Sequence, residues 1–225
     1  CADYSQIEYR VLAHVSKQPE LIEAFHNGID VHAQTMATIR GIPVDQVSKA
    51  ERSVGKTVNF AAIYGAGPGR VAQTAGIELA EAYVLLDDYW QALPKVLDWK
   101  AETLEFARSK GYVETMFGRR IHLKHILSRD SELRSYHERL AINAPIQGSA
   151  ADLMRFAMVD VYRRAPAKLL LTVHDELVLE ARKDVAEDVK GIVEHCMIHA
   201  ADDLVDWLVP IEVEAKIGRT WREAK

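Results

Sequence analysis

Apolar residues recur at helical spacing along most of the chain and form short unbroken runs near its end. Three- and four-residue spacing predicts helices at about 7–15, 19–28, 30–40, 49–64, 78–92, 95–110, 129–143, 147–163 and 184–206. Strand-like runs lie at 1–3, 168–173, 177–180 and 211–217, with short extended pieces within 112–123. The run from Gly65 to Gly69 predicts a helix stop and a turn, and Pro145 is expected to separate two helices. Because helices dominate, the predicted fold class is α+β, with a small antiparallel β-sheet.

Two aspartates lie where predicted strands end. Asp3 follows the first strand, and Asp175 lies at the tip of a tight hairpin between the strands at 168–173 and 177–180. The residues around the hairpin are apolar, which predicts that the sheet is buried on one face: Leu170, Leu171, Val173, Leu177 and Val178. Two carboxylates close together repel each other, and a divalent cation relieves that repulsion. The alternative for either aspartate alone is a helix cap or a turn former.

Two cations and two aromatic rings recur every fourth residue in the helix predicted at 49–64. Arg52, Lys56, Phe60 and Tyr64 therefore share one slowly drifting face. Arginine offers a planar fork to phosphates and lysine a compact charge, while Phe60 suits stacking on a sugar or base. This order of groups fits a nucleoside triphosphate. The alternative is an ordinary amphipathic surface helix.

Composition and charge narrow the class of protein. The 225 residues are 48% apolar and 27% charged, which is typical of a globular protein and excludes a disordered chain. No apolar run approaches the roughly 18 residues of a membrane span. Two cysteines cannot form a disulfide framework, so a reducing, intracellular location is expected, with Cys196 on a buried helix face.

The net charge of −5 is unevenly distributed. Residues 117–139 carry six bases against three acids, whereas 180–214 carry ten acids against three bases. A local basic stretch binds polyanions even in an acidic protein. The alternative is a solvated surface of mixed charge.

Three segments, in order, carry a resemblance to a known family. Asp3-Tyr-Ser-Gln-Ile-Glu-Tyr-Arg10 resembles motif A of family A DNA polymerases, the bacterial DNA polymerase I type. Arg52-x3-Lys56-x2-Asn59-Phe60-x3-Tyr64-Gly65 resembles their motif B, and His174-Asp175-Glu176 resembles motif C. The resemblance covers essentially all of the chain. It implies a right-hand polymerase fold, here incomplete, in which a helix-rich fingers subdomain lies on a palm that holds the sheet.

The resemblance implies a catalytic set built on metal ions. Asp3 and Asp175 would hold two Mg²⁺ ions, for which Mn²⁺ could substitute, and the backbone carbonyl of Tyr4 would be a further ligand. Glu176 would be a supporting carboxylate. Glu8 would close on the sugar 2′ position, admitting deoxyribonucleotides and disfavouring ribonucleotides.

The resemblance also implies sites for nucleotide and DNA. Arg52 and Lys56 would bind the incoming deoxynucleoside triphosphate, Phe60 would stack on its sugar, and Tyr64 would lie near the templating base. His32 would lie near the phosphates. Four polar residues would contact primer–template DNA near the new base pair: Arg139, Asn143, Gln147 and His174.

By the same resemblance, residues 1–30 are expected to be a palm part with motif A, 31–120 the fingers with the nucleotide-binding helix at about 49–64, and 121–225 the palm part with motif C. Thumb and exonuclease domains are expected to lie outside these residues, so we expect weak or no activity without an upstream polymerase fragment as partner. Cys1 is compatible with a split-intein junction or with an ordinary palm-strand residue. The expected location is the cytoplasm of a bacterium or a phage-infected cell, in association with the nucleoid.

The predicted function is template-directed DNA synthesis, which adds deoxynucleotides to a primer 3′-hydroxyl and releases pyrophosphate by two-metal-ion catalysis. One alternative is a single-subunit RNA polymerase-like enzyme, against which Glu8 and Glu176 argue. Another is a non-catalytic DNA-binding remnant. Four intact residues argue against it: Asp3, Asp175, Arg52 and Lys56.

Overall fold

A computed structural model describes residues 1–224, which form two units. The sheet unit comprises residues 1–11 and 147–224, and the helical unit comprises residues 12–146. The chain thus divides by its contacts near residues 11 and 146, whereas the sequence predicted boundaries at 30 and 120. The assignment of palm and fingers to particular residues stays a prediction.

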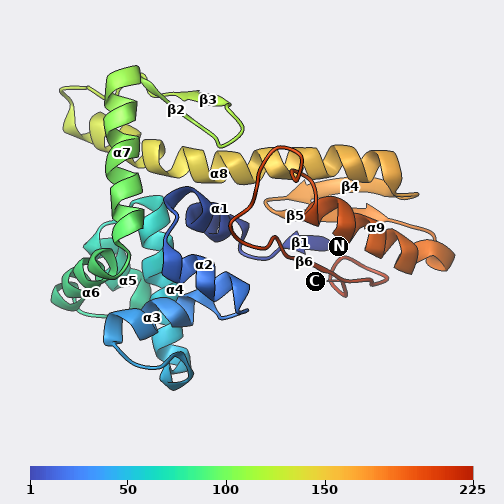
Figure 1. The fold of residues 1–225 in the computed structure, drawn as a ribbon, viewed down its shortest axis with the longest axis horizontal. Coiled ribbons are helices and arrows are strands. Elements are labelled where there is room, and N and C mark those ends of the chain that lie inside the picture. Colours follow the sequence, from blue (N-terminus) through green and yellow to red (C-terminus); the bar gives the residue numbers. More distant parts are fainter. Residues whose placement is uncertain (225) are drawn as a thin grey trace. The chain divides into compact units, whose positions relative to one another are not determined.

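The helical unit is built from α-helices and one hairpin (Figure 1). Its elements are α2 (Pro19–His26), α3 (Val31–Arg40), the 3₁₀ turn η1 (Val44–Gln46), α4 (Lys49–Tyr64), α5 (Pro68–Ala75), α6 (Leu79–Ala92), α7 (Pro94–Lys110), β2 (Tyr112–Glu114) and β3 (Arg120–His122). Helices α1 (Ile7–Ser16) and α8 (Ser131–Arg164) have residues in both units.

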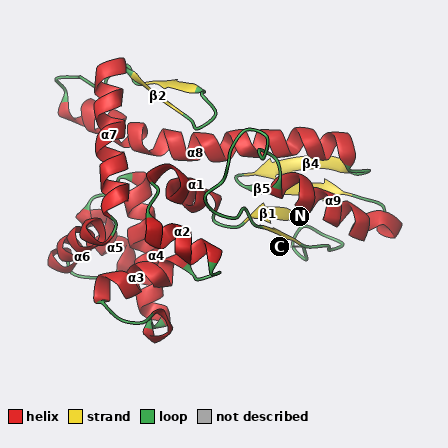
Figure 2. Ribbon diagram, in the orientation of Figure 1, coloured by secondary structure: helices red, strands yellow, loops and turns green. Residues whose placement is uncertain are grey.

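The sheet unit contains the remaining elements, which Figure 2 separates by type. They are β1 (Ala2–Tyr4), β4 (Lys168–Val173), β5 (Glu176–Glu180), the 3₁₀ turn η2 (Lys183–Val185), α9 (Ala186–Ile198) and β6 (Val213–Ala215). The four strands form an antiparallel sheet in the order β4-β5-β1-β6. The predicted α+β class with a small antiparallel sheet is therefore confirmed.

Strand β1 is central to this sheet, although it has only three residues. It pairs with β5 on one side and with β6 on the other, so that Asp3 lies opposite both Glu176 and Glu214. The buried Tyr4 donates its hydroxyl to the carbonyl of Met197 at 2.7 Å, which ties β1 to α9. One face of the sheet is thus covered by α9, and Cys196 of that helix is buried as predicted.

Strand β4 is the edge of the sheet, and here the predicted burial is wrong. Leu177 and Val178 of β5 are buried, but Leu170 and Leu171 of β4 are 53% and 42% exposed. The prediction that the sheet is buried on one face holds for β5 but not for these two residues of β4. In the described chain, β4 instead has one strand neighbour, and it shifts register against that neighbour between Leu169 and Leu171.

Three of the helix predictions are wrong, whereas α4 begins where it was predicted. Helix α8 runs unbroken through Pro145 because buried residues on both sides, among them Ala144 and Ile146, keep the helix packed and offset the missing N–H bond. Helix α9 ends at Ile198 rather than near 206, and α5 was not predicted. Helix α4 begins at Lys49 behind a capping box between Ser48 and Glu51.

Helices α3 and α4 approach each other closely at Gly55. A Cβ atom on Gly55 would lie 2.3 Å from the backbone oxygen of His32 and 2.7 Å from Cγ of Met36. Only glycine permits this contact, which sets how α4 lies on α3. None of the helices in residues 1–224 combines the length and the apolar character that crossing a membrane requires.

Candidate functional site

Three carboxylates gather at the end of β1 and in the β4–β5 turn; we call Asp3, Asp175 and Glu176 the carboxylate cluster. The backbone N–H of Tyr4 donates to the carbonyl of Asp175 at 3.1 Å, which fixes the turn against β1. His174 starts the turn with φ of 57°, in the left-handed region. Asp3 and Glu176 lie directly opposite each other across the strand pair. Strand pairing therefore brings together acids from opposite ends of the chain.

Crowding alters the acidity of this cluster. The pKa of Asp3 is raised from 3.8 to about 6, mainly because its carboxyl is partly removed from water and then because of the charges of Asp175 and Glu176 and a hydrogen bond to Asp175. Glu214, on the opposite strand, makes the smallest contribution to this pKa. The negative charges of the cluster therefore repel one another, and either a proton on Asp3 or a bound cation would relieve that repulsion.

The donor set of the cluster fits a hard divalent cation. Carboxylate oxygens suit Mg²⁺, which binds proteins through one or two carboxylates and takes its other ligands from water and substrate phosphates. No group of three or more His, Cys, Asp or Glu within residues 1–224 has the arrangement of a complete metal site. Asp3 and Asp175 supply two carboxylates, which is the number of protein ligands that a Mg²⁺ ion usually has. Their metal binding, and that of the Tyr4 carbonyl, stay predictions.

Glu176 differs from the two aspartates in having a protein partner. Its side chain is buried, and its Oε1 accepts a hydrogen bond of 2.6 Å from Nε1 of Trp221. Trp221 was not predicted as a site residue, because nothing in its sequence neighbourhood indicates that the end of the chain returns to the β4–β5 turn.

The helical unit presents the second set of candidate residues. Arg52, Lys56, Phe60 and Tyr64 form one partly exposed side of α4, which we call the nucleotide face, while Val58 is buried behind it. The rings of Phe60 and Tyr64 are stacked, with centroids 5.8 Å apart and planes 2° apart. Nζ of Lys56 lies 5.9 Å from the centroid of Phe60. The predicted shared face is confirmed, while its ligand stays a prediction.

Helix α3 supports the nucleotide face. Asp30 caps α3 by accepting from the backbone N–H groups of His32 and Ala33, and its other oxygen accepts from Arg52 at 2.6 and 3.1 Å. Partial burial alone would raise the pKa of Asp30, but the bonds from Arg52 and Ala33 outweigh it and hold the pKa below its ordinary value. The sequence analysis missed Asp30 as a partner of Arg52, although its place before the helix is that of an N-cap.

His32 is buried beside this pair. One of its ring nitrogens, Nδ1, lies 2.9 Å from Nδ2 of Asn59. Burial lowers the pKa of His32, the charge of Asp30 raises it, and the charges of Arg52 and Lys56 lower it again, with a net shift downward. His32 is therefore a neutral, fixed group next to the nucleotide face. Asn59 is a second residue whose positioning role the sequence analysis did not predict.

Two of the predicted DNA-binding residues lie at the end of α4. Asn143 of α8 donates to the carbonyl of Tyr64 at 3.4 Å, and a Cβ on Gly65 would be 3.0 Å from Cγ of Arg139. The other two, Gln147 and His174, are exposed in the sheet unit, and Glu8 is half-buried on α1. The structure thus brings Arg139 and Asn143 to Tyr64, and the DNA contacts stay predictions.

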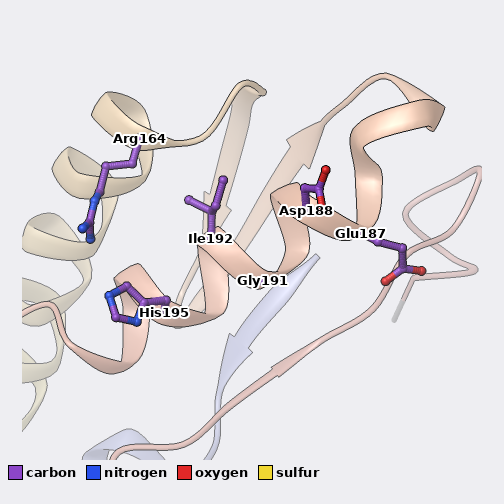
Figure 3. A pocket seen from close by; sticks show the side chains of 6 residues that line it. All are labelled: Arg164, Glu187, Asp188, Gly191, Ile192 and His195. Carbon is purple, nitrogen blue, oxygen red and sulfur yellow. The ribbon is translucent and has the colours of Figure 1, made fainter.

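A pocket of about 710 Å³ lies elsewhere in the sheet unit (Figure 3). It is lined by Arg164 of α8 and by residues of α9: Glu187, Asp188, Gly191, Ile192 and His195. None of the carboxylate cluster lines it, so the candidate site is a surface arrangement of strands rather than this pocket.

Comparisons with known proteins cover the whole chain. The model of DNA polymerase family A matches residues 1–223. "DNA polymerase I, thermostable" of Thermus filiformis is 46% identical over 227 residues, covering 100% of this chain and 27% of that protein. DNA polymerase I of Pseudomonas aeruginosa is 43% identical, covering 99% of this chain and 24% of that protein. The chain therefore spans about a quarter of the length of these relatives.

A solved structure shows the same fold. The polymerase domain of Pol1 from M. smegmatis, in complex with DNA primer-template and dNTP, superimposes with a TM-score of 0.91 at 36% identity. The match covers 99% of this chain and 40% of that chain.

Proposed function

This chain belongs to DNA polymerase family A, and we propose that it contains the catalytic and nucleotide-binding part of a template-directed DNA polymerase. The reaction adds a deoxynucleotide to a primer 3′-hydroxyl and releases pyrophosphate. The observation that carries this proposal is the convergence of Asp3 and Asp175 at the end of β1. The two carboxyl groups are close enough that the charge of Asp175 raises the pKa of Asp3. The M. smegmatis relative, described in complex with primer-template and dNTP, supports the same substrates.

In this proposal Asp3, Asp175 and the Tyr4 carbonyl hold two Mg²⁺ ions, with Glu176 as a supporting charge. Bound metal ions stabilise the negative charge that develops on the attacking and leaving oxygens of a phosphoryl transfer. The pairing of β1 fixes Asp3, and the bond from the Tyr4 N–H to the Asp175 carbonyl fixes the turn, so little reorganisation is needed during the reaction.

The nucleotide face binds the incoming deoxynucleoside triphosphate. Arg52 and Lys56 offer two cations on an exposed side of α4, and Phe60 beside Lys56 offers a ring for the sugar. Asp30 and Asn59 orient Arg52 and His32 respectively. Glu8 closes on the 2′ position and disfavours ribonucleotides.

Primer–template DNA is proposed to contact Tyr64, Arg139 and Asn143 in the helical unit, and Gln147 and His174 in the sheet unit. The contact of Asn143 with the Tyr64 carbonyl supports this grouping for the first three. Polar side chains of this kind read base edges in the minor groove and contact the sugar-phosphate backbone.

Full activity is proposed to need further polymerase segments. In the described chain, Val178, Leu179 and Glu180 of β5 pair with β4 alone, because β1 reaches only Glu176 and Leu177. An additional strand on that side of β5 would complete the sheet that holds the β4–β5 turn. The relatives are about four times as long as this chain, which supports a need for further segments.

A primer-extension assay with Mg²⁺ tests the proposal. The chain is assayed alone and with an upstream polymerase fragment of a relative, and extension is expected to rise strongly with the fragment. Asp175→Ala should reduce extension at least about 1000-fold while primer–template binding is largely retained. Extension that survives this change would refute the assignment of the carboxylate cluster.

The same assay distinguishes the alternatives. Ribonucleotide incorporation comparable with that of deoxyribonucleotides would favour an RNA polymerase-like enzyme. DNA binding without extension under all of these conditions would favour a non-catalytic remnant.

A further inference from the structure

The last described residues fold into a tight turn on the sheet unit. Gly218 allows this turn to close, because a Cβ there would lie 2.7 Å from the backbone nitrogen of Ala224. The N–H of Arg219 donates to the Glu223 carboxylate, and the N–H of Glu223 donates to the Thr220 carbonyl. The turn is therefore held by its own hydrogen bonds.

This turn presents one polar atom to the carboxylate cluster. Trp221 is 42% exposed, so its ring is not a core residue, yet its Nε1 donates to the buried Glu176 at 2.6 Å. An indole N–H is a donor only and does not bind metal. It fixes the direction of one carboxylate oxygen without adding a ligand.

This hydrogen bond affects which of the three acids in the carboxylate cluster can bind a cation. Glu176 lies opposite Asp3 and next to Asp175, so a freely rotating Glu176 carboxylate would compete with them for any cation bound there. Donation from Trp221 occupies Oε1 and withdraws negative charge from it, which weakens Glu176 as a ligand.

We propose that Trp221 is a positioning residue that holds Glu176 as a fixed charge and leaves the divalent ions to Asp3 and Asp175. This inference rests on the proposed function of the cluster and assigns to the residue 218–224 turn a part in it. Outer partners of this kind orient acidic side chains at many metal sites.

Direct Mn²⁺ binding to the chain, without DNA or nucleotide, tests the inference. Trp221→Phe keeps the ring and removes the N–H, so Glu176 becomes free to act as an additional carboxylate ligand, and Mn²⁺ affinity should rise about threefold to tenfold. Single-turnover extension with the upstream fragment should fall about tenfold at saturating metal, with the KM for nucleotide little changed.

Two controls separate the possible outcomes. In a Glu176→Gln background, Trp221→Phe should change neither Mn²⁺ affinity nor rate further, because its effect acts through Glu176. Trp207→Phe removes another indole N–H of the sheet unit and should leave Mn²⁺ affinity unchanged.

An unchanged Mn²⁺ affinity in Trp221→Phe overturns the inference, even if extension or thermal stability falls, because a purely structural role would give that result. If Asp3→Asn and Asp175→Ala also leave Mn²⁺ binding intact, the proposed function fails as well. If those two variants lose binding while Trp221→Phe does not change it, only the role of Trp221 fails.

Discussion

The carboxylate cluster and the nucleotide face place charged groups by contrasting means. In the sheet unit, strand pairing sets Asp3 opposite Glu176, so like charges accumulate and the pKa of Asp3 rises. In the helical unit, Asp30 and Arg52 lie on neighbouring helices and neutralise each other, so the pKa of Asp30 falls. The first arrangement stores repulsion that a cation relieves, and the second is already balanced before any ligand arrives.

This difference predicts how each region responds to mutation. Removing an acid from the cluster should lower activity and raise the stability of the fold, because the acids repel one another. Removing a group from the α3–α4 contact should harm the fold first, since the groups there hold each other. Stability and activity are therefore expected to change in opposite directions in the first region and together in the second.

Asp3→Asn gives the largest expected effect. Extension in the presence of the upstream fragment should fall at least about 1000-fold, because a proposed metal ligand is lost. Thermal stability in EDTA at pH 7.5 should nevertheless rise, because a repelled charge is removed. Glu214→Gln, which neutralises the other acid opposite Asp3, is the matched control and should change extension less than about twofold. A fall in the Tm of Asp3→Asn would contradict the claim that charge repulsion at Asp3 destabilises the folded protein.

Gly55→Ala should have the next largest effect, on stability. The new Cβ would meet the His32 backbone at 2.3 Å, so α3 and α4 must separate, at a cost of about 1–3 kcal/mol. Gly191→Ala is the control, because it makes the same change inside α9 with nothing within 4 Å, and it should stabilise by up to about 1 kcal/mol. Urea unfolding measures both. Equal effects of the two substitutions would show that the close helix contact does not constrain α4.

Asp30→Ala should cost about 1 kcal/mol, because the N-cap of α3 is lost. Asp30→Asn retains the cap and loses only the charge facing Arg52, so it should cost less than about 0.5 kcal/mol. Since the folded pKa of Asp30 is depressed, its contribution to stability is present above the unfolded pKa of about 3.8 and is lost as pH falls through the lower, folded value. Urea unfolding near pH 3 should therefore give a smaller gap between wild type and Asp30→Asn than unfolding at pH 7.

The pH dependence of the cluster should be the smallest effect and opposite in sign. The pKa of Asp3 is 3.8 in the unfolded chain and about 6 when folded. Between these values the folded state binds more protons, so the free energy of unfolding in EDTA should fall as pH rises from about 4 to about 6. Asp3→Asn should lack this slope, and Mg²⁺ at pH 7.5 should recover part of the lost stability. An identical slope in the two proteins would show that Asp3 is not the group responsible.

The sequence predicted the nucleotide face more completely than the cluster. Arg52, Lys56, Phe60 and Tyr64 share a face by helical spacing alone, and a local rule of this kind needs no knowledge of the rest of the fold. The convergence of Asp3 with Asp175 was predicted from their positions at strand ends and from the family resemblance, and not from a local spacing rule. The pairing register that sets Glu176 opposite Asp3 is a property of the folded sheet.

Other features were out of reach because they depend on packing. Pro145 is a helix breaker by propensity, and buried neighbours on either side override that tendency. By propensity, Gly55 should weaken helix α4. The structure shows that glycine is needed there because α3 packs too closely for a side chain. Helix α5 has Val71 as its one buried residue, so its apolar periodicity is too weak to detect. Trp221 reaches Glu176 from a turn whose path no local pattern indicates.

The exposed edge of β4 has a practical consequence for work with this polypeptide. Backbone N–H and C=O groups of an outer strand that also carries Leu170 and Leu171 on its surface are a template for strands of other molecules. Purified material is therefore expected to self-associate as its concentration rises, with light scattering increasing before any loss of secondary structure. Leu171→Lys places a charge on this edge and should keep the preparation monodisperse for the metal-binding and unfolding measurements.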